Sequence, residues 1–158
     1  EVVEVQGIEV TPHVIEPSYG IDRMIYAVLE QRYDEDEADG EVRKVMRLPA
    51  AVAPIQVAIL PLMTRDGLDT IALDITKKLQ EKGIMAEYDD SGAIGRRYRT
   101  QDEVGTPFAV TIDYDTKETG TVTLRDRDSM KQVRVAVSDL NSTINDLISG
   151  MRTFSSMV

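Results

Sequence analysis

Apolar strand patterns alternate with helical patterns through the middle of the chain, and this order constrains the fold more than any other feature. Residues 55–60 form the continuous apolar run of a buried strand. A helical repeat follows and is closed by Gly83; its apolar positions are Leu68, Ile71, Ala72, Ile75 and Leu79. Strand patterns return at residues 84–88 and 107–113, with a helical stretch near 94–103 between them. This order predicts a sheet with parallel neighbours and helices on its faces.

Later segments extend the predicted sheet. Residues 121–124 and 132–137 alternate like strands, and a polar, turn-rich link over 113–120 precedes them. They suggest an antiparallel addition to the sheet. A last helix follows, with inward-facing Leu140, Ile144, Leu147 and Ile148. The predicted class is therefore α/β, with a mixed sheet of about five strands and helices on both faces.

Composition limits the environments and partners open to the chain. It has 158 residues, a net charge of −10 and no cysteine, so disulfides and thiolate metal sites are excluded. The acidic balance argues against nonspecific adhesion to nucleic acid or anionic membrane and leaves room for a local, selective contact with nucleic acid. No apolar run is long enough to span a bilayer, and no signal pattern begins the chain. We expect a cytoplasmic protein.

The first third of the chain has a different character from the rest. Residues 1–5 read as a strand with nothing before it, which suggests a piece cut from a longer chain, and a helix is predicted over about 20–33. The acidic run 34–41 reads as a solvated loop. Prolines then interrupt periodic structure within residues 42–54. We place a domain boundary near residue 49.

The segment Ile15-Glu16-Pro17-Ser18-Tyr19-Gly20-Ile21-Asp22-Arg23 suits a polar ligand site. A loop that feeds the N-terminus of a helix offers free backbone N–H groups to an anion. Glu16 offers a charged hydrogen-bond acceptor, and Arg23 offers a planar cation, to a polar ligand. The alternative is that Glu16 only complements the helix dipole and that Arg23 pairs with Glu30 or the acidic run.

Two later groups of arginines are candidates for nucleic-acid contacts. Arg96, Arg97 and Arg99 flank Tyr98 and combine phosphate-binding cations with a ring that can stack on unpaired bases. They could equally bond within the domain to Asp102, Glu103 or Asp89, with Tyr98 in the core. Arg125 and Arg127 alternate with aspartates, which favours a self-paired surface over base readout. Lys131 and Arg134 would extend a basic stripe if they share the face of these arginines.

Other polar residues give no candidate for metal binding or catalysis. His13 is the sole histidine, with no visible partner, and is predicted to be a loop residue. Asp89 and Asp90 precede Ser91 and Gly92, a pattern typical of a turn into the next helix. We predict no metal site and no catalytic residue.

Four ordered blocks closely resemble the C-terminal part of the glycyl-tRNA synthetase family, in its dimeric archaeal and eukaryotic class II form. The blocks are residues 14–23, 89–98, 102–113 and 123–130. The resemblance implies that residues 1–48 end a catalytic domain with its third signature motif, as a strand–helix remnant. Residues 49–158 would be the class II anticodon-binding fold.

The resemblance also implies roles for individual residues. Glu16 and Ser18 would hold glycine, Gly20 and Arg23 would contact ATP, and the tRNA anticodon would meet the groups Arg96, Arg97, Tyr98, Arg99, Arg125 and Arg127. The full-length enzyme would be a homodimeric glycine–tRNA ligase that uses ATP with magnesium, glycine and glycine tRNA, without DNA or membrane partners. This fragment would recognise mainly the anticodon, lack activity alone and hold no cofactor.

Two other functions remain open at this point. Related anticodon-binding folds occur in noncatalytic accessory modules that bind nucleic acid, although retention of Glu16, Ser18 and Arg23 argues against that function. A sister synthetase for threonine, proline or histidine would share the C-terminal fold. The Glu-Pro-Ser form of the third motif favours glycine.

Overall fold

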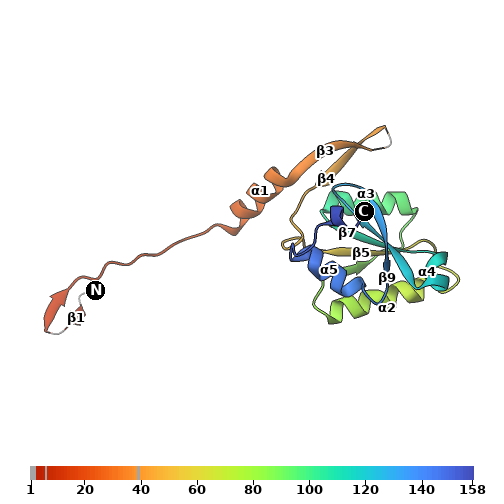
Figure 1. Cartoon of the computed structure of the whole chain (residues 1–158). Coiled ribbons are helices and arrows are strands. Elements are labelled where there is room, and N and C mark those ends of the chain that lie inside the picture. The colour runs from red at the N-terminus through yellow and green to blue at the C-terminus, as the bar shows by residue number, and fades with distance from the viewer. Residues whose placement is uncertain (1–2, 6, 39) are drawn as a thin grey trace. The chain divides into compact units, whose positions relative to one another are not determined.

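The computed structural model describes residues 3–5, 7–38 and 40–158. Two compact units divide the chain, the first covering residues 1–31 and the second residues 32–158. Figure 1 shows the elements of both units.

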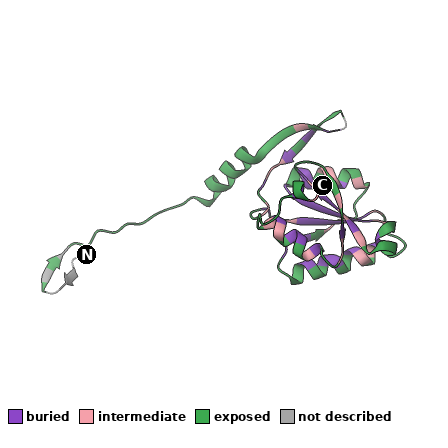
Figure 2. Cartoon of the chain, viewed as in Figure 1, coloured by how far each residue is buried: buried purple, intermediate pink, exposed green. Residues whose placement is uncertain are grey.

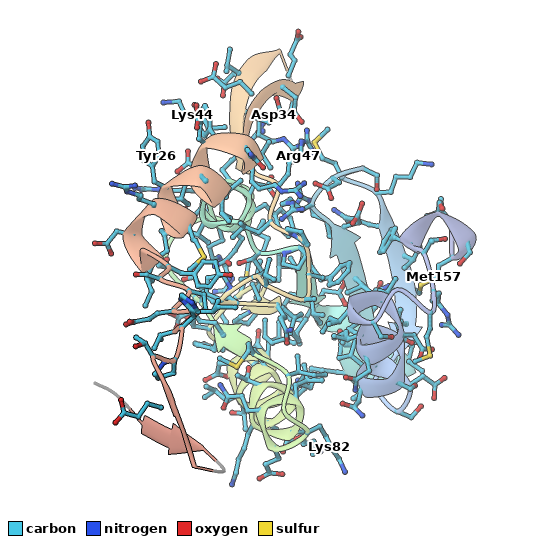
Figure 3. All side chains as sticks on the ribbon, turned by 90° about the vertical axis from the view of Figure 1, so that its left-hand side faces the viewer. Tyr26, Asp34, Lys44, Arg47, Lys82 and Met157 are labelled. Carbon is cyan, nitrogen blue, oxygen red and sulfur yellow. The ribbon has the colours of Figure 1, made fainter. Side chains whose placement is uncertain are left out.

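The first unit holds little regular structure. Strands β1 (Val3–Val5) and β2 (Ile8–Val10) pair antiparallel. The chain then runs without helix or strand as far as α1 (Ile21–Arg32), whose last residue already belongs to the second unit. No residue of α1 is buried, and Figure 3 shows Tyr26 projecting outward from this helix. The predicted helix is present, and the predicted opening strand is present over residues 3–5, while its residues 1–2 lie outside the described residues.

The second unit opens with an antiparallel hairpin of β3 (Tyr33–Ala38) and β4 (Glu41–Met46). The expectation of a loop over residues 34–41 is therefore wrong for most of that run. Opposite charges face each other across the hairpin, because Glu35 pairs with Lys44 and Asp36 pairs with Arg43. Such cross-strand pairs stabilise a strand that is too polar to be recognised from its own sequence.

A five-stranded sheet forms the centre of the second unit, in the order β6-β5-β7-β8-β9. Its strands are β5 (Val57–Pro61), β6 (Ala86–Tyr88), β7 (Phe108–Ile112), β8 (Thr121–Asp126) and β9 (Gln132–Ala136). The first three strands of that order are parallel, and β8 and β9 are antiparallel to their neighbours. The predicted mixed sheet of about five strands is confirmed.

Helices cover the two faces of this sheet unequally (Figure 2). The main core lies under α2 (Leu68–Glu81) and α5 (Leu140–Ile148), where large aliphatic side chains such as Ile59, Val110 and Leu124 are fully buried. The opposite face carries smaller residues, and α3 (Ile94–Val104) packs there. The predicted helices on both faces are confirmed.

The link over residues 113–120 contains a short helix, α4 (Tyr114–Thr119), where a turn-rich link was expected. Asp113 caps it: its carboxylate accepts a hydrogen bond from the Thr116 backbone N–H, and the Thr116 hydroxyl accepts one from the Asp113 backbone N–H. This reciprocal cap stabilises a helix too short to show an apolar period. A 3-10 turn at Phe154–Ser156 ends the fold. No helix within the described residues is long and apolar enough to cross a membrane.

Candidate functional site

The predicted glycine and ATP residues lie together in the first unit, at the entrance to α1. Glu16, Ser18, Gly20 and Arg23 are all exposed. The Gly20 carbonyl accepts a hydrogen bond from the Met24 N–H at 3.3 Å and closes the first turn of α1. The aliphatic carbons of Arg23 lie 3.8 Å from the position that a Cβ on Gly20 would occupy. The segment thus presents a carboxylate, a hydroxyl and a guanidinium without burying any of them.

In the second unit, α3 covers a sheet face whose buried residues include two alanines. Ala58 and Leu60 of β5 and Ala109 of β7 are buried there, and Ile94 and Tyr98 of α3 pack against them. The Tyr98 hydroxyl hydrogen-bonds the Thr111 hydroxyl at 2.5 Å. Tyr98 is therefore half buried, and packing against the sheet and its hydroxyl hydrogen bond hold its side chain in place. This agrees with the alternative that Tyr98 lies in the core, although part of the residue still faces solvent.

A groove of about 680 Å³ runs between the hairpin, α3 and the turn from β8 to β9. Its lining residues are Glu37, Ala38, Glu41, Gly95, Arg96, Tyr98, Arg99, Arg125, Met130 and Gln132. Four of the six residues predicted to contact tRNA therefore meet at one groove, although they come from two separate stretches of sequence. Arg97 and Arg127 do not line it.

Two of the lining residues, Tyr98 and Arg125, form a stacked pair. The guanidinium carbon of Arg125 lies 4.8 Å from the centre of the Tyr98 ring, which is a cation–π contact. Asp102 of α3 fixes this guanidinium by accepting from Nη1 at 2.8 Å and from Nη2 at 3.0 Å. Because Asp102 is 0% and Arg125 only 7% exposed, this bidentate ion pair is a rigid part of the domain.

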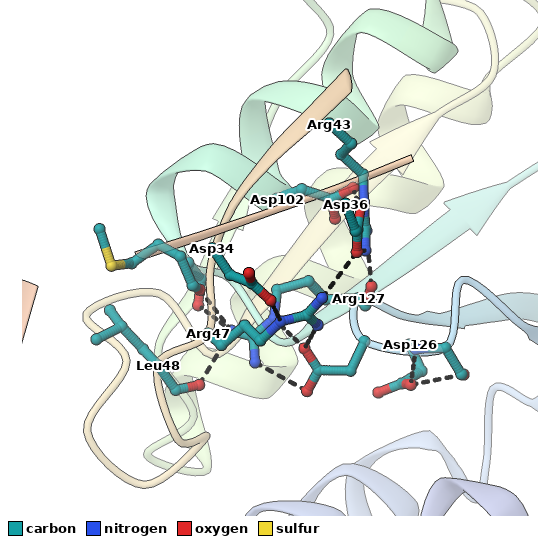
Figure 4. Close-up of polar contacts among 12 residues, drawn as sticks. Asp34, Asp36, Arg43, Arg47, Leu48, Asp102, Asp126 and Arg127 are labelled. Carbon is teal, nitrogen blue, oxygen red and sulfur yellow. Dashed lines mark hydrogen bonds and ion pairs between the residues drawn. The ribbon is translucent and has the colours of Figure 1, made fainter. Parts of the chain in front are cut away.

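The hairpin joins the same ionic cluster through Arg43, which is 1% exposed. Arg43 Nη1 donates to Asp102 at 3.0 Å and to the Arg127 carbonyl at 2.8 Å, and Arg43 Nε donates to Asp36 at 2.7 Å. The hydrogen bond between Arg43 and Asp36 raises the pKa of Arg43 and lowers the pKa of Asp36. The bond to Asp102 raises the pKa of Arg43 further. The two ends of one guanidinium thus connect β3 to α3 (Figure 4).

A second cluster fixes the end of the hairpin. Arg47 donates to Asp34 at 2.7 Å and to Asp128 at 2.9 Å, and Arg127 holds Asp128 with bonds of 2.9 and 3.0 Å. Burial of Asp128 opposes its ionisation, but the two arginines outweigh that effect and lower its pKa. Arg127 Nη1 also donates to the carbonyls of residues 46, 48 and 105. Arg127 therefore joins three parts of the chain inside the domain.

Arg97 has a similar internal position. Its side chain is 3% exposed, and Nη1 donates to the carbonyls of Pro61 at 2.7 Å and Asp89 at 3.0 Å. These are the final residue of β5 and the residue that follows β6, so Arg97 holds α3 across the ends of two strands. Hydrogen bonds within the domain, the alternative left open by the sequence, engage Nη1, although the acceptors are carbonyls rather than carboxylates. The Nε of Arg97 is buried without a hydrogen-bond partner in the described part of the chain.

Arg134, a residue of the predicted basic stripe on β8 and β9, is engaged by two carboxylates. Arg134 pairs with Thr123 across the strands and so shares the sheet face of Arg125. Its guanidinium bonds Asp113 at 2.8 Å and Asp115 at 2.7 Å. Partial burial opposes the charge, but these carboxylates raise the pKa of Arg134.

Six lining residues were not among the predicted contacts, namely Glu37, Ala38, Glu41, Gly95, Met130 and Gln132. The two glutamates were assigned to a solvated loop because the run around them contains almost nothing to bury. A signal was present in the alternation of Asp34 and Asp36 before Arg43 and Arg47, which predicts a self-paired hairpin.

Comparison with known proteins adds independent findings. A family model described as the anticodon binding domain matches residues 56–147. The glycine–tRNA ligase of Archaeoglobus fulgidus is 53% identical over 140 residues, which make up 89% of this chain and 25% of that protein. The ligase of Methanothrix thermoacetophila is 51% identical over 152 residues, 96% of this chain and 26% of that protein. The chain thus spans about a quarter of the length of the curated relatives it matches.

Proposed function

The chain belongs to the anticodon-binding domain family, and from this membership we propose that it is the anticodon-recognising part of a glycine–tRNA ligase. Sequence identity above 50% to the archaeal glycine–tRNA ligases supports glycine over the sister synthetases and over a noncatalytic accessory module. The longer protein would activate glycine with ATP and magnesium, acylate glycine tRNA and work as a homodimer in the cytoplasm. Residues 1–48 would end its catalytic domain, and residues 49–158 would hold the anticodon.

The groove beside α3 is the observation that carries the anticodon-binding proposal. Arg96 is exposed, and Arg99 is half buried and donates to the Ala38 carbonyl at 3.1 Å. Both place cations beside the planar stack of Tyr98 and Arg125. Proteins bind unpaired RNA with cations that neutralise its phosphates and with planar groups on which its bases stack. Arg97 and Arg127 would act by positioning α3 and the hairpin, since Arg97 Nη1 and the Arg127 guanidinium donate to acceptors within the domain.

In the longer protein, Glu16 and Ser18 would bind glycine, and Gly20 and Arg23 would contact ATP. Glu16 can accept hydrogen bonds from the glycine ammonium, and Ser18 adds a small polar group beside it. Arg23 can stack on the adenine, because its guanidinium is planar. The described residues contain no cluster of three or more metal-binding side chains that would hold magnesium.

Binding to glycine tRNA and to the same tRNA with an unrelated anticodon tests the proposal. The whole chain should prefer the native anticodon, and Arg96→Ala should weaken binding and reduce the salt dependence by about 0.7 in log–log slope, the value for one phosphate on a single strand. Lys82→Ala is the control, because Lys82 is exposed at the end of α2 and points away from the domain (Figure 3). Equal binding of both tRNAs, unaffected by Arg96→Ala, would refute the proposal.

A further inference from the structure

Arg97 differs from the other buried arginines of the second unit in the partners of its charge. Each of the others in the described part of the chain bonds at least one aspartate, namely Arg43, Arg125 and Arg127. Among the described residues, the acceptors of Arg97 are the carbonyls of Pro61 and Asp89, and both receive their hydrogen bond from Nη1. A buried charge is ordinarily compensated by an opposite charge. Arg97 therefore carries a cation that no carboxylate of the described residues neutralises.

The remaining donors of Arg97 form the edge of the guanidinium between Nε and Nη2. Within the part of the chain that the structure describes, Nε is buried without a hydrogen-bond partner, and the two carbonyl bonds use Nη1 alone. The same edge of Arg127 holds both carboxylate oxygens of Asp128, at 2.9 and 3.0 Å. Two parallel N–H donors of this kind match two oxygens of an oxyanion. The free edge of Arg97 thus suits a negatively charged ligand.

Arg97 lines a cavity of about 280 Å³ at the carboxyl ends of β5 and β6. The other lining residues follow these two strands in the sequence, namely Leu62, Met63, Thr64, Arg65, Asp90 and Gly92. The chain leaves β5 for α2 on one face of the sheet and leaves β6 for α3 on the opposite face. Adjacent parallel strands with diverging connections form a crevice in which α/β proteins bind ligands. The cavity shares no lining residue with the groove beside α3, so it is a separate site.

The charges around this cavity favour an anion. Arg65 is exposed, and its Nε and Nη2 lie 3.3 and 3.2 Å from the sulfur of Met63, a weak acceptor that an anion would replace. Asp90 adds a carboxylate, which accepts a hydrogen bond from the Tyr88 hydroxyl at 3.1 Å, but two guanidinium groups outnumber it. The N-cap of α3, Ala93, provides no side-chain acceptor for the first N–H groups of the helix. Such N–H groups also favour negative charge.

We propose that this cavity binds a phosphate group through the Nε–Nη2 edge of Arg97, the guanidinium of Arg65 and the N-terminus of α3. These donors come from a loop, a helical side chain and a helix backbone. A phosphate directs oxygens toward all three, whereas a carboxylate has only two oxygens in one plane. Arg97 thus positions α3 through Nη1 and binds the ligand through its other edge. The phosphate belongs either to a free small molecule or to an RNA backbone, since both carry the same chemical group.

Nuclear magnetic resonance of the whole chain, titrated with inorganic phosphate, tests this site. The Nε–H signal of Arg97 and the N–H signals at the start of α3 should shift together and reach saturation, whereas acetate at the same ionic strength should leave them unchanged. Arg65→Gln should weaken phosphate binding by about tenfold, the effect of losing one hydrogen bond to a charged group. Lys82→Gln removes an exposed cation at the end of α2, outside the cavity, and should keep the full affinity.

The same titration with bound glycine tRNA distinguishes the two sources of phosphate. Shifts that disappear in the complex identify an RNA phosphate as the ligand, and shifts that persist identify a free phosphate compound. Shifts that never saturate, or an unchanged affinity in Arg65→Gln, would overturn the inference, because phosphate would then bind without a defined site. Equal binding of glycine tRNA and a tRNA with an unrelated anticodon would overturn the proposed function and leave the phosphate titration unaffected.

Discussion

Replacing Asp102 by asparagine should destabilise the second unit more than any exchange of an exposed charge. Asp102 is completely buried and accepts three hydrogen bonds of 2.8 to 3.0 Å from the guanidinium groups of Arg43 and Arg125. Asparagine has nearly the same shape but no charge, and its amide N–H donors would face the arginine donors. Removing one partner from a buried ionic cluster costs about 3–5 kcal/mol.

Urea denaturation followed by circular dichroism measures this cost. With a slope of about 2 kcal/mol per molar urea, a loss of about 4 kcal/mol lowers the midpoint by about 2 M. Asp74→Asn is the matched control, because Asp74 pairs with Lys78 at 2.6 Å on the exposed side of α2, where both side chains are more than half exposed. Such a pair contributes at most about 0.5 kcal/mol. Equal midpoints for the two variants would refute the assignment of Asp102 as the buried anchor.

Three further predictions concern other parts of the second unit. Gly105→Ala should destabilise this unit by more than Gly120→Ala. Both glycines have positive φ, which costs alanine about 1–2 kcal/mol, but only at Gly105 would the new Cβ lie 2.8 Å from a Leu48 carbon. Equal urea midpoints for the two variants would contradict this. Absorbance titration should show Tyr88 ionising near pH 12, because burial raises its pKa to about 12, and Tyr88→Phe should remove that step. Because the pKa is higher in the folded than in the unfolded chain, the stability that this group contributes is complete below pH 10 and declines as pH rises from about 10 to 12. A chain that starts at residue 49 should unfold at lower urea than the whole chain, since it lacks the hairpin bonds to the ionic cluster.

The sheet could be predicted because its signals are local. Residues 57–60 are apolar without interruption, and each helix that packs on the main core repeats its apolar positions at helical spacing. These patterns depend on neighbours within a few residues, so one stretch of sequence is enough to read them. The same patterns predict the order along the chain of the five sheet strands and of α2, α3 and α5, but not the hairpin or α4.

The groove could be predicted only in part, because the state of a charged side chain depends on distant partners. Arg125 looks like a surface residue until Asp102, 23 positions earlier, is placed beneath it. Arg97 is buried and donates hydrogen bonds to backbone carbonyls. Every residue has such a carbonyl, so the sequence does not indicate which ones Arg97 contacts. The sequence therefore indicates residues of which the structure brings four to one groove, but it does not divide the charged ones into those that face solvent and those that hold the fold together.

The hairpin shows that a boundary drawn from sequence can separate residues that act together. The predicted boundary lies near residue 49, whereas the compact unit begins at residue 32 and includes the hairpin. Arg43 bonds Asp102, Asp102 fixes Arg125, and Arg125 lies over Tyr98 in the groove. A series of three direct contacts therefore connects the hairpin to the planar stack. A shift of the hairpin would have to break a buried ion pair before it could move independently of the groove, so both walls of the groove should behave as one rigid element.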